Sequence, residues 1–431
     1  MEATINSCKL CAPLGASLAY LGMEGTIPLL HGSQGCATYI RRYLISHFRE
    51  PVDIASSNFS ESTAVFGGQS NLLTALANLK RQYNPELIGI ASTCLSETIG
   101  DDVAGYLNGF DEVPTVNVST PSYQGGHEPA FWKTGAKVLE KFAQKNTTIE
   151  QINLFPGMVS TEDIRYLKEI FFEMGIKAVL FPDYSERLDG ESWSSHQKLP
   201  KGGTTVEEIR GSGSSELSVE FCTVWQDTPG NALSSACEVT NMRMALPIGI
   251  NLTDAFFNTL KRPVPEKYLS ERGRLVDAYM DNHKYIFEKK AILYGDQELV
   301  IGLASFLSEI GIIPVVVASG SKSGNLEEQI KSVISFGQDQ VMVKEGIDFD
   351  QLTRLAEQFK PDLLIGSSKG YHIARELQVP LIRVGFPIHD RIGGQRTLHL
   401  GYRGTQALFD RIVNAILEKN QELSPVGYSY M

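Results

Sequence analysis

The chain has 431 residues, which is enough for two or three domains with large cores and no disulfide staples. Lys and Arg number 39 and Asp and Glu number 50, so the net charge is −11, which argues against a nucleic-acid-binding protein with a basic face. No apolar run reaches the roughly 20 residues of a membrane helix, and the first residues do not read as a signal peptide. We therefore expect a cytoplasmic protein with reduced cysteines and no membrane or nucleic-acid partner.

Short apolar segments alternate with helical segments along the chain. The predicted strands are Glu86–Ala91, Ile152–Phe155, Lys177–Phe181, Lys290–Tyr294, Ile312–Val317, Asp362–Ile365 and Pro380–Val384. The clearest predicted helices are Ser62–Gln82, Thr161–Met174, Pro265–Lys289, Glu298–Ile310 and Phe349–Phe359. Continuous rather than alternating hydrophobicity in the strands is typical of parallel strands covered on both faces. The sequence thus predicts an α/β fold with mainly parallel sheets.

This alternation of strands and helices restarts at Ile152 and again at Lys289. The pattern predicts three Rossmann-like domains, at residues 1–145, 146–285 and 286–431. The polar, glycine-rich segment Leu188–Gly213 is expected to be a surface excursion, and Gly211–Ser215 a flexible turn.

The common nucleotide and hydrolase motifs are absent from the sequence. It contains neither a dinucleotide-binding G-x-G-x-x-G nor a P-loop. Ala318–Gly324 follows a strand and could hold a phosphate, but an ordinary polar loop is favoured. No histidine pair has the H-E-x-x-H spacing of a zinc protease. A Ser/His/Asp triad stays open, although no nucleophile elbow supports one.

Three cysteines of the first hundred residues stand at predicted helix starts. Cys11 precedes a helical segment, Cys36 ends a glycine-rich turn, and Cys94 ends the turn after a buried strand. Free N–H groups and positive partial charge at helix N-termini favour the thiolate, the form that binds metal. Cys36 and Cys94 also follow strands, and open α/β sheets build sites at the carboxyl ends of their strands. This arrangement favours a metal site over buried, inert cysteines.

The other cysteines have less support. Cys222 and Cys237 lie in apolar runs and are expected to be core residues. Cys8 and Cys11 form a C-x-x-C, but no second such pair completes a zinc site, and the role of Cys8 stays open. Iron–sulfur clusters usually take four cysteines, so a fourth ligand is needed. It could come from a partner chain or from Ser122, just past the predicted strand Thr115–Val118.

A further set of motifs, taken together, resembles the motifs of one protein family. It comprises residues 11–51 (CAPLGASLAYLGMEGTIPLLHGSQGCATYIRRYLISHFREP), AVFGG (Ala64–Gly68), STCLSETIGDD (Ser92–Asp102), STPSYQGGH (Ser119–His127), GGTTVEEI (Gly202–Ile209), ERGRLVD (Glu271–Asp277), LYGD (Leu293–Asp296) and VGFPIHDR (Val384–Arg391). Together these motifs resemble the β-type subunits of nitrogenase component 1.

The resemblance implies three Rossmann-like domains and an α-type partner, NifE- or NifD-like, in an α2β2 heterotetramer. It implies an iron–sulfur cluster, [4Fe–4S] or [8Fe–7S], shared with that partner and served by an ATP-dependent iron protein. The matching metal positions are Cys11, Cys36, Cys94 and Ser122. The complex metal cofactor is expected on the partner chain.

Two branches of the family remain open. The short start before Cys11, GYRGT at Gly401–Thr405 and the ending VGYSYM resemble the NifN-type scaffold that matures the molybdenum–iron cofactor. The alternative is the catalytic β subunit of nitrogenase or of a nitrogenase-like reductase, such as one acting on methylthio-alkanes. A third possibility, from another class, is an iron-free binding or structural subunit.

Overall fold

The computed structural model describes residues 8–195 and 197–426. The first residues and the ending from Gly427, both used above, lie outside this range. Within it, no helix combines the length and the apolar character needed to cross a membrane. The chain divides into two compact units. The first comprises Leu10–Phe221 and Trp225–Arg243, and the second comprises the residues from Met244 onward together with Cys8, Lys9 and Cys222–Val224.

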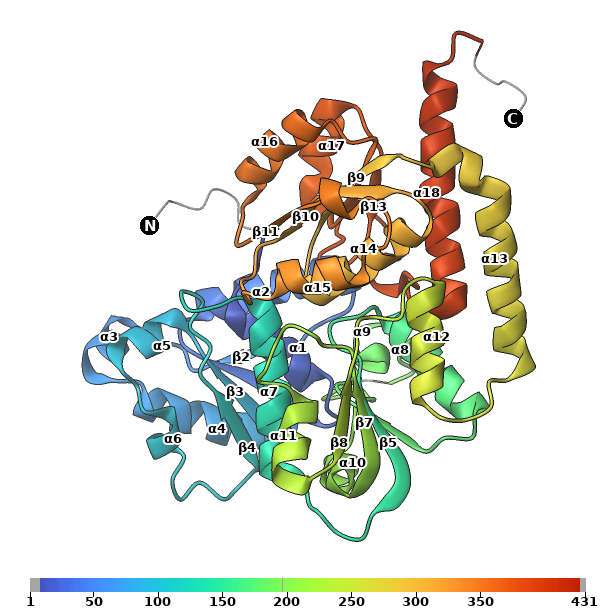
Figure 1. Cartoon of the computed structure of the whole chain (residues 1–431). Helices are drawn as coiled ribbons and strands as arrows, with labels where there is room; N and C mark the ends of the chain where they lie inside the picture. The colour runs from blue at the N-terminus through green and yellow to red at the C-terminus, as the bar shows by residue number, and fades with distance from the viewer. Residues whose placement is uncertain (1–7, 196, 427–431) are drawn as a thin grey trace. The chain divides into compact units, whose positions relative to one another are not determined.

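The first unit contains two four-stranded parallel sheets (Figure 1). The first sheet has the order β2-β1-β3-β4, with β1 at Thr26–His31, β2 at Ala55–Ser56, β3 at Leu87–Ser92 and β4 at Thr115–Val118. The second has the order β6-β5-β7-β8, with β5 at Ile149–Phe155, β6 at Ala178–Leu180, β7 at Ser215–Glu220 and β8 at Thr240–Arg243. The helices are α1 (Ala12–Leu21), α2 (Gln34–Phe48), α3 (Glu61–Phe66), α4 (Gln69–Tyr83), α5 (Cys94–Ile99), α6 (Val103–Tyr106), α7 (His127–Phe142), α8 (Thr161–Glu173), α9 (Ser185–Leu188), α10 (Val206–Gly211) and α11 (Pro229–Cys237).

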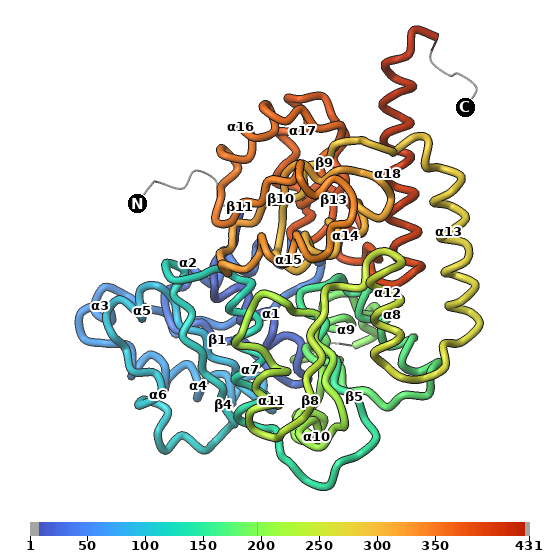
Figure 2. Tube along the Cα trace, viewed as in Figure 1, coloured from blue at the N-terminus to red at the C-terminus, as the bar shows by residue number. Residues whose placement is uncertain are grey.

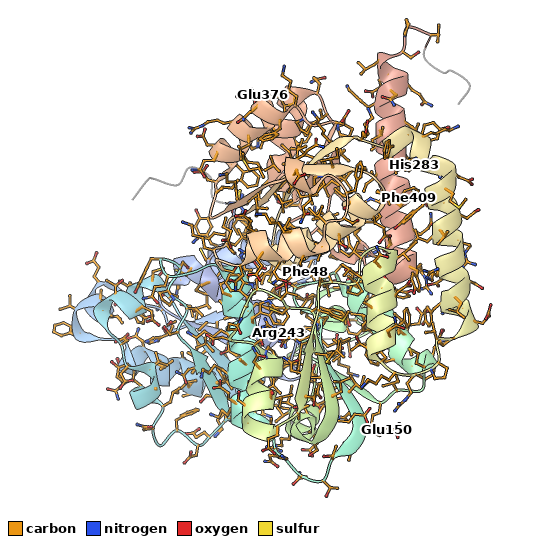
Figure 3. The ribbon with its side chains drawn as sticks, viewed as in Figure 1. Phe48, Glu150, Arg243, His283, Glu376 and Phe409 are labelled. Carbon is orange, nitrogen blue, oxygen red and sulfur yellow. The ribbon has the colours of Figure 1, made fainter. Side chains whose placement is uncertain are left out.

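The second unit contains one five-stranded parallel sheet in the order β11-β10-β9-β12-β13. Its strands are β9 (Lys290–Tyr294), β10 (Ile313–Ser319), β11 (Met342–Glu345), β12 (Leu363–Gly366) and β13 (Leu381–Arg383). Its helices are α12 (Ile250–Thr259), α13 (Glu266–Ile286), α14 (Gln297–Glu309), α15 (Leu326–Val333), α16 (Phe349–Phe359), α17 (Tyr371–Leu377) and α18 (Gly401–Leu423). The long helices α13 and α18 run side by side (Figure 2). Phe409 of α18, labelled in Figure 3, packs on Tyr279 of α13 with ring centroids 5.0 Å apart.

The three sheets confirm the predicted α/β class with parallel strands. All seven predicted strands exist within two residues of their predicted ends except at the start of β5, which begins three residues earlier. Strands β3 and β10 are buried at every position, which explains their continuous hydrophobicity. The domain boundaries at 145 and 285 stay predictions. The first two sheets share one compact unit, and the helical block of α13 packs with the third sheet's unit.

Two local predictions were wrong. The helix predicted at Ser62–Gln82 is two helices, α3 and α4, because Gly67 adopts a positive φ of 87° between them. The predicted flexible turn Gly211–Ser215 is instead ordered: Gly211 ends α10, and residues 212–215 are buried and pass through a 3₁₀ turn into β7. Asn153 donates to the Ser212 carbonyl (3.0 Å), and a Cβ on Gly213 would lie 2.6 Å from the Gln144 carbonyl oxygen. A sequence of serines and glycines suggests a mobile segment when it is considered alone. Here the small side chains permit close packing instead.

Candidate metal centre at the carboxyl edge of the first sheet

Cys11 is the N-cap of α1 and is exposed. The helix behind it is buried along its whole length, between the first sheet and α7. Gly15 permits this close packing, since a Cβ there would lie 1.8 Å from the His127 carbonyl oxygen. The hydroxyl of Tyr20 donates to carbonyls of β3 and β4 (Ile90, 3.2 Å; Val116, 3.0 Å). Packing of α1 therefore fixes Cys11 next to the sheet, although Cys11 itself is exposed.

Cys36 and Cys94 follow strands, as predicted, and the structure shows that these two strands are adjacent and parallel. Cys36 is the third residue of α2 after β1, and Cys94 is the first residue of α5 after β3. The strands end in register, with His31 opposite Ser92. The N–H and hydroxyl of Thr93 both donate to the His31 carbonyl, at 3.2 and 3.1 Å. Both thiols are exposed at the same edge of the sheet.

Ser122 links the turns of Cys94 and Cys11. Its backbone N–H donates to the Sγ of Cys94 (3.3 Å), and its Oγ accepts from the N–H of Ala12 (3.2 Å). Its loop is anchored to β3 because Thr120 donates through both N–H and hydroxyl to Ser92. The structure thus brings the region of Cys11, Cys94 and Ser122 together, with Cys36 on the neighbouring turn.

The remaining cysteines lie in other environments. Cys8 belongs to the second unit and packs on Gly320 and the core of the third sheet. Burial raises the pKa of the Cys8 thiol to about 12, which favours the protonated form that does not bind metal. Cys222 and Cys237 are buried, as predicted, and the Cys222 thiol donates to Glu298.

The donor chemistry of this edge fits an iron–sulfur group. Three exposed thiols stand at helix N-termini, where N–H groups stabilise thiolates. A backbone N–H directed at Sγ, as at Cys94, is a typical means of tuning such clusters. In the described part of the chain, no three His, Cys, Asp or Glu side chains converge closely enough to hold a single metal ion. The case for an iron–sulfur cluster therefore rests on the type of donor, three thiols, and on their common position at the carboxyl edge of the first sheet.

A buried histidine network lies directly beneath these turns, and the sequence did not predict it. His31 Nε2 contacts the Asp101 carboxylate at 3.0 Å, and Nδ1 contacts the Ser57 hydroxyl at 3.1 Å. This is a Ser/His/Asp arrangement, the possibility left open above. Ser57 is 2% exposed and its Oγ already accepts from the N–H of Gly32 (2.9 Å). A nucleophile must reach its substrate, so the arrangement is structural.

The candidate phosphate loop at Ala318–Gly324 already has a protein acceptor for its N–H groups. The Glu345 carboxylate accepts from the N–H groups of Ser323 (2.8 Å) and Gly324 (3.2 Å). A phosphate would have to displace a carboxylate of the same charge. This supports the ordinary-loop interpretation.

Comparison with known proteins places this geometry in a family. The family model described as "Nitrogenase component 1 type Oxidoreductase" matches residues 11–417. The chain belongs to this family. The match begins at the first candidate ligand, Cys11, and extends through all three sheets.

Several relatives in the family are named as beta chains of nitrogenases. The molybdenum–iron protein beta chain of Clostridium pasteurianum is 35% identical, over 96% of this chain and 93% of its own length. That of Azotobacter vinelandii is 34% identical over 97% of this chain and 85% of its own. The vanadium–iron protein beta chain of Trichormus variabilis is 33% identical over 96% and 94%.

Solved structures agree with this placement. A chain of the structure titled "Nitrogenase Cp1 at pH 6.5" superposes with a TM-score of 0.96 at 33% identity, covering 100% of this chain and 97% of that one. A chain of "Nitrogenase Cp1 at pH 5" reaches 0.72 at 15% identity, which shows a common fold alone.

Proposed function

We propose that this chain is the β-type subunit of a nitrogenase-like α2β2 complex, holding an iron–sulfur cluster through Cys11, Cys36 and Cys94. The observation that carries the proposal is the presence of three exposed thiols at helix starts along one edge of a sheet. Ser122 lies among them and is the candidate fourth donor. The relatives named nitrogenase beta chains support the subunit type.

The residues of this chain would supply ligands and set their surroundings. When bound, the cluster supplies an electron relay toward the cofactor on the α-type partner. The Ser122 N–H stabilises negative charge on the Cys94 sulfur, and the turns of Cys36 and Cys94 keep their N–H groups at the same edge. The complex metal cofactor is assigned to the partner.

Within the family, we favour the scaffold branch, the NifN-type subunit of cofactor maturation. The chain is about equally distant from molybdenum–iron and vanadium–iron beta chains, at 33–35% identity. This even distance supports a branch separate from either catalytic group, in line with the resemblance of GYRGT at Gly401–Thr405 to scaffold subunits. The second candidate is a catalytic β subunit, which the names of these relatives favour.

An exposed apolar rim supports a partner covering the cysteine edge. The rim consists of large side chains from the elements that carry or flank the cysteines, namely Tyr39, Val65, Phe66, Leu95 and Tyr123. A contiguous exposed apolar surface marks a protein interface, and these side chains are the candidates for such a surface here. An α-type partner seated here would complete a shared cluster and cover the rim.

Leu95→Asp should weaken the αβ pair because it places a charge in the proposed apolar interface. We expect the pair's dissociation constant to rise about tenfold or more, as measured by analytical ultracentrifugation of the complex. Leu73→Asp is the matched control, since Leu73 on α4 is 38% exposed and Leu95 is 39% exposed. Equal weakening by both variants would contradict the interface.

The function is tested on the complex with its natural partner, purified without oxygen. It is combined with the iron protein and ATP, and substrate reduction is measured alongside iron per αβ pair. Weak turnover, a single small cluster and activation of cofactor-free nitrogenase would support the scaffold. Vigorous turnover with a large, double-cubane iron content would establish the catalytic subunit. A colourless, iron-free complex would overturn both.

A further inference from the structure

Three donors from different parts of the first unit meet at the carboxylate of Asp101, which follows α5. It accepts from His31 Nε2 (3.0 Å), from the N–H of Gly68 (3.0 Å) and from the hydroxyl of Tyr106 (3.1 Å). The side chains of His31 and Asp101 are 0% and 2% exposed. Gly68 allows the close approach, since a Cβ there would lie 2.6 Å from Asp101 Oδ2.

The direction of each hydrogen bond follows from the donors available. The Gly32 N–H donates to Ser57 Oγ, so the Ser57 hydroxyl hydrogen is free to point at His31 Nδ1. His31 Nε2 then carries the proton that Asp101 accepts. Burial lowers the pKa of His31, which agrees with this neutral tautomer. Each polar atom in this chain of bonds has a partner, as a buried network requires.

The network is bonded to the turns of both strand-end cysteines. The His31 carbonyl accepts twice from Thr93, the N-cap residue before Cys94. Gly32 lies against the Thr93 side chain, where a Cβ would be 2.1 Å from its Oγ1. The same turn continues into α2 and Cys36. The Asp101 N–H in turn donates to the Ser96 carbonyl of α5 (3.1 Å). Any movement of one turn must therefore disturb the other.

We propose that Asp101, acting through His31 and Gly68, is a positioning residue that holds the turns of Cys36 and Cys94 in place before metal binds. The inference rests on the proposed function for the role of those thiols. Its physical basis is preorganisation: ligands held in position by buried bonds lose less conformational freedom when they bind. The network contacts no cysteine directly, so its effect must pass through the backbone of the two turns.

The test is Asp101→Asn in the full complex, purified without oxygen and stripped of iron with a chelator. An asparagine accepts at one oxygen only, so its NH2 group must face at least one of three donors. We expect amide hydrogen exchange in residues 30–37 and 92–101 to accelerate about tenfold, with the second sheet unchanged. Iron and sulfide uptake on reconstitution should also fall. Tyr106→Phe, which removes one donor only, should give a smaller change in the same direction.

Asp111→Asn is the matched control because Asp111 is an exposed aspartate of the same unit. It should leave exchange in both turns unchanged. Wild-type exchange in both turns of Asp101→Asn would overturn the positioning role, whatever the iron content. Accelerated exchange in both turns supports the role even if Cys36→Ala and Cys94→Ala retain full iron, a result that would reject only the proposed ligands.

Discussion

Cys94→Ala and Cys36→Ala should each remove roughly half or more of the iron from the purified complex. Mutating a residue that hydrogen-bonds a metal ligand typically lowers metal affinity about tenfold to a hundredfold. Loss of the thiolate ligand itself should lower the affinity at least as much. Both thiols are exposed at helix starts and neither contributes to a core. The folded subunit should therefore survive the change. Iron and acid-labile sulfide per αβ pair are the measurements, with circular dichroism to verify folding.

Cys237→Ala is the matched control for these variants. Cys237 is a buried cysteine of the same unit, at the end of α11 and beside Gly213. It should cost some stability but no iron. Full iron retention in both Cys36→Ala and Cys94→Ala would remove these residues from the site. The exposed thiols would then need another explanation.

Replacing Glu298 with alanine should produce a large loss of stability in the second unit. Glu298 is the second residue of α14 and is almost completely buried. Its carboxylate accepts from the N–H groups of Thr223 (2.7 Å) and Val224 (3.0 Å) and from the Thr223 hydroxyl (3.1 Å). Alanine leaves these buried donors without their acceptor. A cost of about 3 kcal/mol is expected from the usual penalty for unsatisfied buried groups.

Calorimetry of the full chain measures this loss as a lower unfolding temperature of the second unit, by roughly 5–10 °C. Glu327→Ala is the control, since Glu327 is an exposed residue of the same unit paired with Lys331, and its effect should stay within about 0.5 kcal/mol. An equal effect of the two variants would contradict the role of Glu298.

Glu298 also predicts a pH dependence of stability. Burial raises the pKa of Glu298, and hydrogen bonds from Val224 and Thr223 only partly oppose this. The folded state therefore holds this proton to higher pH than the unfolded state does. The Glu298 contribution to stability must fall as pH rises above the ordinary glutamate range. Glu298→Gln should abolish that part of the slope, and an unchanged slope would show that other groups cause it.

The sequence by itself determined the α/β class, most strand positions and the place of each candidate cysteine relative to its helix. These features depend on local signals. Apolar runs of four to six residues mark buried parallel strands, and glycine-rich turns after strands mark helix starts. The positions of Cys36 and Cys94 followed from the turns after strands, and that of Cys11 followed from the helical segment after it. The structure places all three at helix starts.

Local signals failed where the outcome depended on distant residues. Gly211–Ser215 is flexible by composition, but Asn153 and Gln144 enclose it. The helix predicted at Ser62–Gln82 breaks at Gly67, and the next residue, Gly68, donates to Asp101 more than thirty residues later.

Only the tertiary structure decided which polar groups meet at the cysteine edge. Asp101 and His31 are 70 positions apart in the chain, and Ser122 is 28 positions from Cys94. Parallel strands in register bring the ends of β1 and β3 together, and with them the loops that follow. Periodicity records which face of an element is buried, but it carries no information about which loop lies next to which. That neighbourhood depends on strand order, and so the positioning network became visible only in the folded chain.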